Sequence, residues 1–154
     1  MLFLWIFGDN IEHRLGHLRF VVFYLLCGFA ASLAHILFNS GSNIPAVGAS
    51  GAISGVMGGY VVLYPLARVY TLVFLGFFLT TIALPAWTMI GYWALIQIVS
   101  GVGSLGAENE GGVAFWAHIG GLAAGVVLIR FFARDDYVQE HRAHQWAPKR
   151  LGWR

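Results

Sequence analysis

The sequence predicts an all-α membrane protein, a polytopic bundle of about four full transmembrane helices and a partial one at the N-terminus. Of its 154 residues, 58% are apolar and only 10% are charged, whereas a soluble domain carries about 25% charged residues. A surface that faces water cannot be built from so few charges. The 20 glycines against four prolines favour closely packed helices, because glycine lets the backbones of membrane helices approach each other.

Four apolar runs are long enough for membrane spans, which need about 20 residues each. They cover residues 20–38, 51–66, 86–105 and 113–132. Residues 1–7 are apolar but too few to cross, so we expect them to end an earlier helix at a turn formed by Gly8 and Asp9. The alternative, a cleaved signal peptide, would need a basic segment before the apolar residues and small residues after them. We therefore expect a truncated chain or a misassigned start, and a chain that is poorly folded or inactive by itself.

Charge placement predicts the topology. If only the four runs cross, all nine Lys and Arg residues fall on one side, and the opposite loops, 39–48 and 106–112, carry none. The positive-inside rule makes the basic side cytoplasmic. Segment 69–84 is apolar enough for a fifth span, but that crossing would move six basic residues outside. We therefore expect this β-branched and aromatic segment to be re-entrant, interfacial or an early start of the next helix.

The domain organisation predicted is one transmembrane domain over 1–133 and a polar cytoplasmic tail over 134–154. The tail contains His141 and His144, an HxxH pair that we interpret as solvent-exposed because no further ligands stand at metal spacing. Cys27 is the only cysteine, so no intramolecular disulfide can form. A net charge of +2 is too small to indicate nucleic acid, and no phosphate-binding glycine motif occurs. We expect no cofactor or metal, with membrane lipid and other membrane proteins as partners.

A serine between glycines stands where a loop is expected to become the second full span, in the segment Gly48-Ala49-Ser50-Gly51. A helix N-terminus offers unpaired backbone N–H groups and a positive dipole end, which can stabilise the oxyanion formed when a serine attacks a carbonyl. Ser50 is therefore a candidate nucleophile, with the backbone of its three neighbours as support. The alternative is that Ser50 is simply an N-cap.

His118 lies about five residues inside the outer end of the last span, a depth at which ionisable residues are rare and usually functional. Span 51–66 is short, so Ser50 and His118 are expected to share one layer of the membrane. Small residues repeat every four positions on both helices, at Gly51, Gly55 and Gly59 and at Ala117, Gly121 and Gly125. If these faces meet, His118 can lie within about 3 Å of Ser50 and act as its general base. The alternative for His118 is a hydrogen bond to a neighbouring helix.

With these motifs the sequence resembles the rhomboid family of intramembrane serine proteases. Residues 48–51 are similar to its GxSG nucleophile motif, and residues 117–121 with Gly125 are similar to its histidine-bearing last core helix; segments 7–12 and 85–87 also look rhomboid-like. The resemblance implies a rhomboid-like helical core in which Ser50 and His118 form a dyad. It implies a serine-type endopeptidase that cleaves transmembrane or membrane-proximal segments of substrate proteins, in a bacterial inner or plasma membrane.

Two departures from the family pattern affect this interpretation. The family's first core helix, and the outer half of the second with a histidine and an asparagine that help hold the oxyanion, would precede Met1. Ser54 stands where family members often have an aromatic residue that packs on the catalytic histidine, which implies a less firmly oriented His118. A non-catalytic rhomboid-like protein that binds client transmembrane helices is the alternative function. A transporter or channel would need more polar residues at mid-bilayer depth than the sequence contains.

Overall fold

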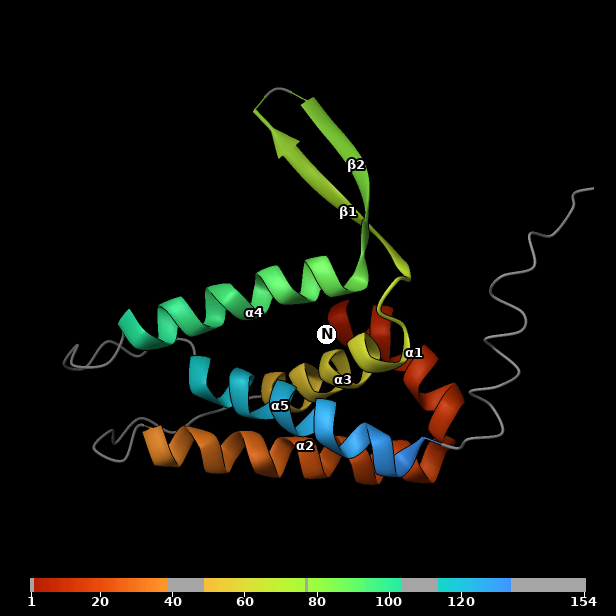
Figure 1. Cartoon of the computed structure of the whole chain (residues 1–154), viewed down its shortest axis with the longest axis vertical. Coiled ribbons are helices and arrows are strands. Elements are labelled where there is room, and N and C mark those ends of the chain that lie inside the picture. The colour runs from red at the N-terminus through yellow and green to blue at the C-terminus, as the bar shows by residue number, and fades with distance from the viewer. Residues whose placement is uncertain (1, 39–48, 77, 104–113, 134–154) are drawn as a thin grey trace, which may run out of the picture.

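The computed structural model describes residues 2–38, 49–76, 78–103 and 114–133 (Figure 1). Its elements are α1 (Leu2–Leu15), α2 (His17–Phe38), α3 (Ser50–Leu63), β1 (Arg68–Leu75), β2 (Phe78–Pro85), α4 (Ala86–Gly103) and α5 (Phe115–Phe132). Helices α2, α4 and α5 are long and apolar enough to cross a membrane, and α3 is a shorter apolar helix of 14 residues. The predicted class, a helical membrane bundle, is therefore confirmed.

The predicted turn at Gly8 and Asp9 is wrong, because α1 continues through both residues to Leu15. Gly8 is buried, and a Cβ there would lie 3.2 Å from the Leu4 side chain and 3.7 Å from Phe20. This glycine thus serves close packing inside a helix. The chain turns instead at Gly16, whose φ of 81° is a conformation that glycine adopts without steric cost.

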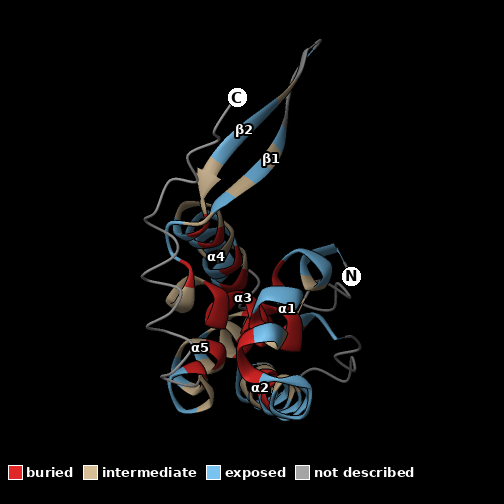
Figure 2. Ribbon diagram, turned by 90° about the vertical axis from the view of Figure 1, so that its right-hand side faces the viewer, coloured by how far each residue is buried: buried red, intermediate tan, exposed pale blue. Residues whose placement is uncertain are grey.

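Helix α3 lies at the centre of the bundle, where every residue from Gly51 to Tyr60 is buried. Figure 2 shows the buried residues gathered on α3 and on the helix faces that surround it. Helix α3 packs most extensively against α5, and it also contacts α1, α2 and α4. Because α3 is enclosed, the surrounding helices fix the position of its first turn.

Segment 69–84 forms an antiparallel hairpin of β1 and β2, with Arg68 opposite Pro85 and Leu75 opposite Phe78. An early start of the next helix is wrong, since α4 begins only at Ala86. The β-branched and aromatic residues that suggested an irregular segment instead pair as strands, which is where such side chains pack well. The hairpin projects from one end of the bundle, crosswise to the long helices (Figure 1).

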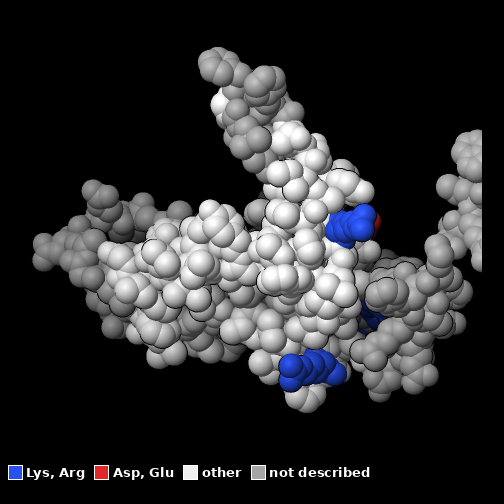
Figure 3. Space-filling model, turned by 45° about the horizontal axis from the view of Figure 1, so that its top comes forward, with Lys and Arg blue, Asp and Glu red and all other residues white. Residues whose placement is uncertain are grey.

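The arginines among the described residues lie at one end of the bundle. They stand at the end of α1, the start of α2, the base of β1 and the end of α5, as Arg14, Arg19, Arg68 and Arg130. Figure 1 brings these four element ends together, and in the view of Figure 3 the visible basic side chains gather at that end. This placement agrees with the predicted topology. The other five basic residues, and the predicted tail over 134–154, lie outside the described residues.

Candidate active site

Ser50 is the first residue of α3, and Ala49 occupies the cap position without any side-chain cap hydrogen bond. The alternative interpretation of Ser50 as the N-cap is therefore wrong. The first N–H that bonds back along the chain is that of Ile53, which donates to the Ala49 carbonyl at 3.0 Å. The N–H groups of the first turn, from Ser50 to Ala52, are the ones that a helix start leaves without intrahelical acceptors. Gly48 lies outside the described residues.

His118 is buried in the first turns of α5, where its Nδ1 lies 2.7 Å from the side-chain oxygen of Gln97 on α4. An amide oxygen only accepts hydrogen bonds, so Nδ1 carries the proton and donates it to Gln97. A neutral imidazole has one protonated nitrogen, and Nε2 is therefore left as an acceptor. This arrangement prepares His118 to take up a proton at Nε2.

Trp93 stands one helical turn before Gln97 on α4, so both side chains face α5 from the same side of the helix. Its ring centroid lies 5.7 Å from that of His118, with the planes tilted by 39°. Sequence analysis missed both residues, although a glutamine inside an apolar span is a recognised sign of hydrogen bonding between membrane helices. Helix α4 thus orients His118 by one hydrogen bond and one aromatic contact.

The small-residue faces of α3 and α5 lie against each other. A Cβ at Gly121 would overlap the carbonyl oxygen of Gly51, and a Cβ at Gly125 would overlap that of Gly55. Gly59 differs, since it faces the side chains of Phe23 and Ile129. Two backbones in direct contact along this seam fix the positions of the first turns of α3 and α5 relative to each other.

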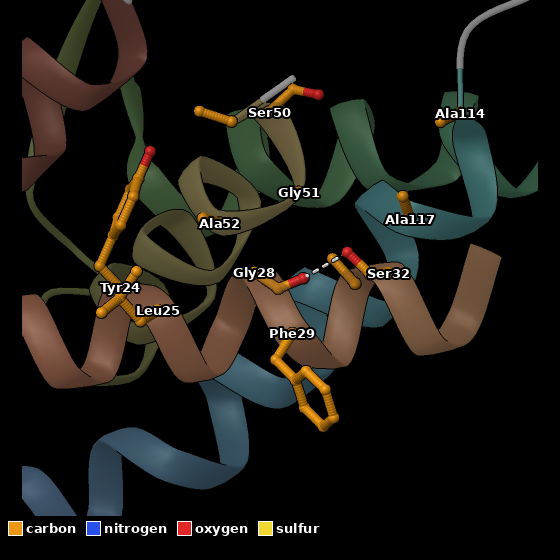
Figure 4. Close-up of a pocket in the computed structure, with 12 residues that line it drawn as sticks. Tyr24, Leu25, Gly28, Phe29, Ser32, Ser50, Gly51, Ala52, Ala114 and Ala117 are labelled. Carbon is orange, nitrogen blue, oxygen red and sulfur yellow. Dashed lines mark hydrogen bonds between the residues drawn. The ribbon is translucent and has the colours of Figure 1, made fainter. Parts of the chain in front are cut away.

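Ser50 and His118 stand at adjoining ends of this seam. A Cβ at Gly51 would lie 3.4 Å from the carbonyl oxygen of Ala117, so the residues next to Ser50 and His118 in sequence are neighbours in space. Among the described residues, however, no hydrogen bond joins the two side chains. Figure 4 shows the Ser50 hydroxyl directed away from α2, toward the side on which Ala114 and Ala117 lie. The predicted separation of about 3 Å therefore remains a prediction about the reacting state.

A cavity of about 300 Å³ opens beside Ser50 between α2, α3 and α5. Its walls are mostly small or apolar, and they comprise Tyr24, Leu25, Gly28, Phe29, Ala31, Ser32, Ala49, Ser50, Gly51, Ala52, Ala114 and Ala117. Ser32 already donates its hydroxyl hydrogen to the Gly28 carbonyl at 3.0 Å (Figure 4). Two serines thus line one cavity, and the Ser50 hydroxyl is the one without a hydrogen bond to a described residue.

The described part of the chain offers no metal centre beside this site. No group of three or more His, Cys, Asp or Glu side chains there is placed to hold a metal ion. Cys27 is buried as a free thiol against Gly55. The pair His141 and His144 lies outside the described residues.

Comparison with known proteins gives one family. A family model described as "Rhomboid domain" matches residues 1–135. Rhomboid protein 1, mitochondrial, of Saccharomyces cerevisiae is 29% identical over 97% of this chain and 41% of its own length. RHOMBOID-like protein 4 of Arabidopsis thaliana is 33% identical over 83% of this chain and 28% of its own. Rhomboid protease GluP of Bacillus subtilis is 33% identical over 80% of this chain and 20% of its own.

The chain spans less than half the length of each of these relatives. No solved structure matches. Because the relatives come from a yeast, a plant and a bacterium, they do not support a bacterial membrane in particular. They agree with the fold in indicating a multi-pass integral membrane protein.

Proposed function

This chain belongs to the rhomboid family, and on that premise we propose that it forms the catalytic core of an intramembrane serine endopeptidase. Its substrates would be transmembrane or membrane-proximal segments of other proteins. The observation that carries the proposal is the glycine seam between α3 and α5, which sets the Ser50 turn beside a His118 whose Nδ1 is already engaged by Gln97.

The proposed chemistry is acyl transfer through a dyad. Nε2 of His118 accepts the proton of the Ser50 hydroxyl while Oγ attacks the carbonyl carbon of the scissile peptide bond. The oxygen of the tetrahedral intermediate is stabilised by N–H groups of the first turn of α3 and by the positive end of its dipole. His118 then gives its proton to the leaving amine, and a water activated by the same imidazole hydrolyses the acyl-enzyme.

One movement is needed before this reaction. The Ser50 hydroxyl has to turn toward Nε2, because no hydrogen bond joins the two side chains in the structure. A rotation about χ1 of an exposed serine side chain is rapid, and catalytic hydrogen bonds are often long in proteins without substrate. The cavity beside Ser50 leaves space for a segment of substrate to approach the hydroxyl.

The second candidate function is non-catalytic binding of client transmembrane helices. The absence of a Ser50 to His118 hydrogen bond within the described residues favours it. Under this alternative the Gln97 to His118 bond would only join α4 to α5, and the cavity between α2, α3 and α5 would receive part of a client helix.

The deciding experiment uses the protein as its gene encodes it, reconstituted in liposomes with a model transmembrane substrate. Cleavage and labelling by a fluorophosphonate are expected in the wild type, and both are expected to be lost in Ser50→Ala and His118→Ala. Ser32→Ala is the matched control, since it removes a hydroxyl from the same cavity and should leave both signals. Cleavage that persists without Ser50 would refute the dyad. A folded protein that binds the substrate and never cuts it would favour client binding.

A further inference from the structure

We infer that the β1–β2 hairpin is a membrane-docking surface whose exposed face lies in the headgroup region of the leaflet on the basic side of the bundle. The partner of this face is the phospholipid surface of the membrane that the helices cross. This location of the hairpin does not depend on the proposed proteolysis.

The hairpin has the composition of a lipid-facing element. No Asp, Glu, Lys, Arg or His occurs from Val69 to Ala107, so beyond Arg68 the whole hairpin is uncharged. Tyr70 and Leu72 alternate on one face of β1 and are 73% and 67% exposed, and Ile82 on the opposite face is 42% exposed. A two-stranded sheet is only marginally stable in water, and an exposed apolar edge strand promotes aggregation. Such a hairpin needs an apolar or interfacial environment.

At its base the hairpin is tied to the bundle by two backbone hydrogen bonds. Ala86 donates its N–H to the Ala67 carbonyl at 2.8 Å, and Trp87 donates to the Pro65 carbonyl at 3.1 Å. These two hydrogen bonds fix the direction in which β1 leaves the bundle and β2 returns to it. Just beyond the base, the side chains of Tyr70 and Leu72 are largely exposed.

The exposed face of the hairpin is continuous with a surface that faces lipid. Strand β2 ends at Pro85, and α4, a helix apolar enough to cross the membrane, begins at the next residue. Trp87 and Tyr92 on α4 are 54% and 67% exposed, and aromatic residues with a polar group are typical of the membrane boundary. The hairpin therefore begins at the depth where α4 enters the membrane.

Orientation and charge place the hairpin along this boundary. It leaves the bundle at a steep angle to α2, α4 and α5 and leans back over α4 (Figure 1), so it runs nearer to the plane of a membrane that these helices cross than to the helix axes. Its base carries Arg68, whose guanidinium can reach phosphate groups. Among the described residues the outer edges of β1 and β2 pair with no third strand, and the hydrocarbon core does not tolerate unpaired backbone groups. The headgroup region satisfies all three conditions, since it offers both apolar contact and hydrogen-bonding groups.

The test measures the depth of single labels in the full protein reconstituted in phosphatidylcholine and phosphatidylglycerol liposomes. An environment-sensitive fluorophore is attached to a cysteine introduced at Tyr70 or Leu72, and quenching by nitroxide lipids labelled near the headgroup or deep in the chain is compared. His17→Cys at the exposed first residue of α2 provides the water reference, and Leu95→Cys on the exposed face of α4 provides the deep reference. The buried Cys27 is retained, and unmodified protein measures any label that it takes up.

We expect loss of fluorescence from both hairpin labels with the shallow quencher, greater than at His17, and little loss with the deep quencher, in contrast to Leu95. Quenching no greater than at His17 would overturn the inference and place the hairpin in water. Energy transfer between hairpin labels on different molecules, rising with protein density and without lipid quenching, would also overturn it and assign the face to a second copy. Strong deep quenching would place the hairpin within the hydrocarbon, contrary to the inference.

Discussion

Gln97 on α4 binds His118 on α5 through its side-chain oxygen, which lies 2.7 Å from Nδ1 of the imidazole. Both side chains are buried, so water does not compete for this hydrogen bond. In rhomboid relatives an aromatic residue one turn after the nucleophile is expected to pack on the histidine, and here that position is Ser54. The hydroxyl of Ser54 donates instead to the Ser50 carbonyl at 2.8 Å. Orientation of His118 thus comes from α4 rather than from α3.

The first prediction concerns the hydrogen-bond acceptor. Gln97→Met keeps the length of the side chain and removes the oxygen, so Nδ1 loses its partner and the imidazole can adopt the other tautomer. Because a buried unsatisfied donor costs about 1–3 kcal/mol, we expect kcat/KM for cleavage of a transmembrane substrate to fall by roughly 5- to 160-fold. The measurement is cleavage in liposomes, with ¹⁵N NMR of labelled histidine reporting the tautomer.

Gln97→Glu is the matched control, because its carboxylate also accepts a hydrogen bond from Nδ1–H. It should retain activity that Gln97→Met loses, and it should retain the Nδ1–H tautomer in the NMR spectrum. Equal activity in wild type and Gln97→Met, with Ser50→Ala inactive, would show that the dyad works without this orientation. Loss in both variants together with a lowered Tm would show a packing role only.

A second prediction concerns the aromatic contact on the same imidazole. Trp93→Ala removes a ring 5.7 Å from His118, whereas Trp93→Phe keeps an aromatic surface there. Aromatic pairs contribute about 0.5–1.5 kcal/mol beyond their buried area, so Trp93→Ala should lower kcat more than Trp93→Phe does. Fluorophosphonate labelling rates for the two variants provide the comparison. Equal rates would contradict a role of the ring in orienting His118.

The sequence predicts those parts of the site that depend on residues close together in the chain, and it does not predict contacts between distant helices. The spacing of Gly51, Gly55, Gly121 and Gly125 was readable because small residues four apart share a helix face, and the structure brings these faces into backbone contact. The role of Gln97 cannot be predicted in this way, because nothing local in α4 indicates which helix this side chain contacts. The predicted turn at Gly8 is wrong for a related reason. The sequence alone does not show whether a glycine turns the chain or lets a side chain such as that of Phe20 pack closely against a helix.

The hairpin illustrates the same limit. Periodicity distinguishes poorly between a short buried helix and a strand when nearly every residue is apolar, and only the charge balance excluded another crossing over 69–84. The register that pairs Arg68 with Pro85 depends on contacts between two separate segments, which the pattern within either segment does not reveal. The side of the membrane that charge assigns to each loop stays a prediction, while the strand pairing required the structure.

A third prediction concerns stability at the basic end of the bundle. Nε of the buried Arg14 in α1 donates to the Tyr64 hydroxyl at 2.6 Å, just after α3 ends. Hydrogen bonds to charged groups contribute about 1.5–3 kcal/mol, so Tyr64→Phe should lower the Tm of detergent-solubilised protein by several degrees. Tyr92→Phe is the control, since Tyr92 is exposed on α4. An unchanged Tm in Tyr64→Phe would show that other contacts of Arg14 suffice.

The last prediction tests the glycine seam that sets Ser50 beside His118. Gly121→Ala places a methyl group where the Gly51 carbonyl oxygen already lies, and neither backbone can yield without separating α3 from α5. Overpacking of this kind costs about 1–3 kcal/mol, and it moves the His118 turn away from Ser50. We therefore expect a lower Tm together with a loss of cleavage greater than the loss of folded protein.

Gly91→Ala on α4 is the matched control for that substitution, because no atom beyond its own helix turn lies within 4 Å of the added methyl group. Alanine is the better helix former by about 1 kcal/mol, so this variant should keep both activity and Tm. If Gly121→Ala lowers the Tm but leaves cleavage per folded molecule unchanged, the seam stabilises the bundle without setting the dyad. If neither property changes, the close approach of α3 and α5 at Gly51 is itself wrong.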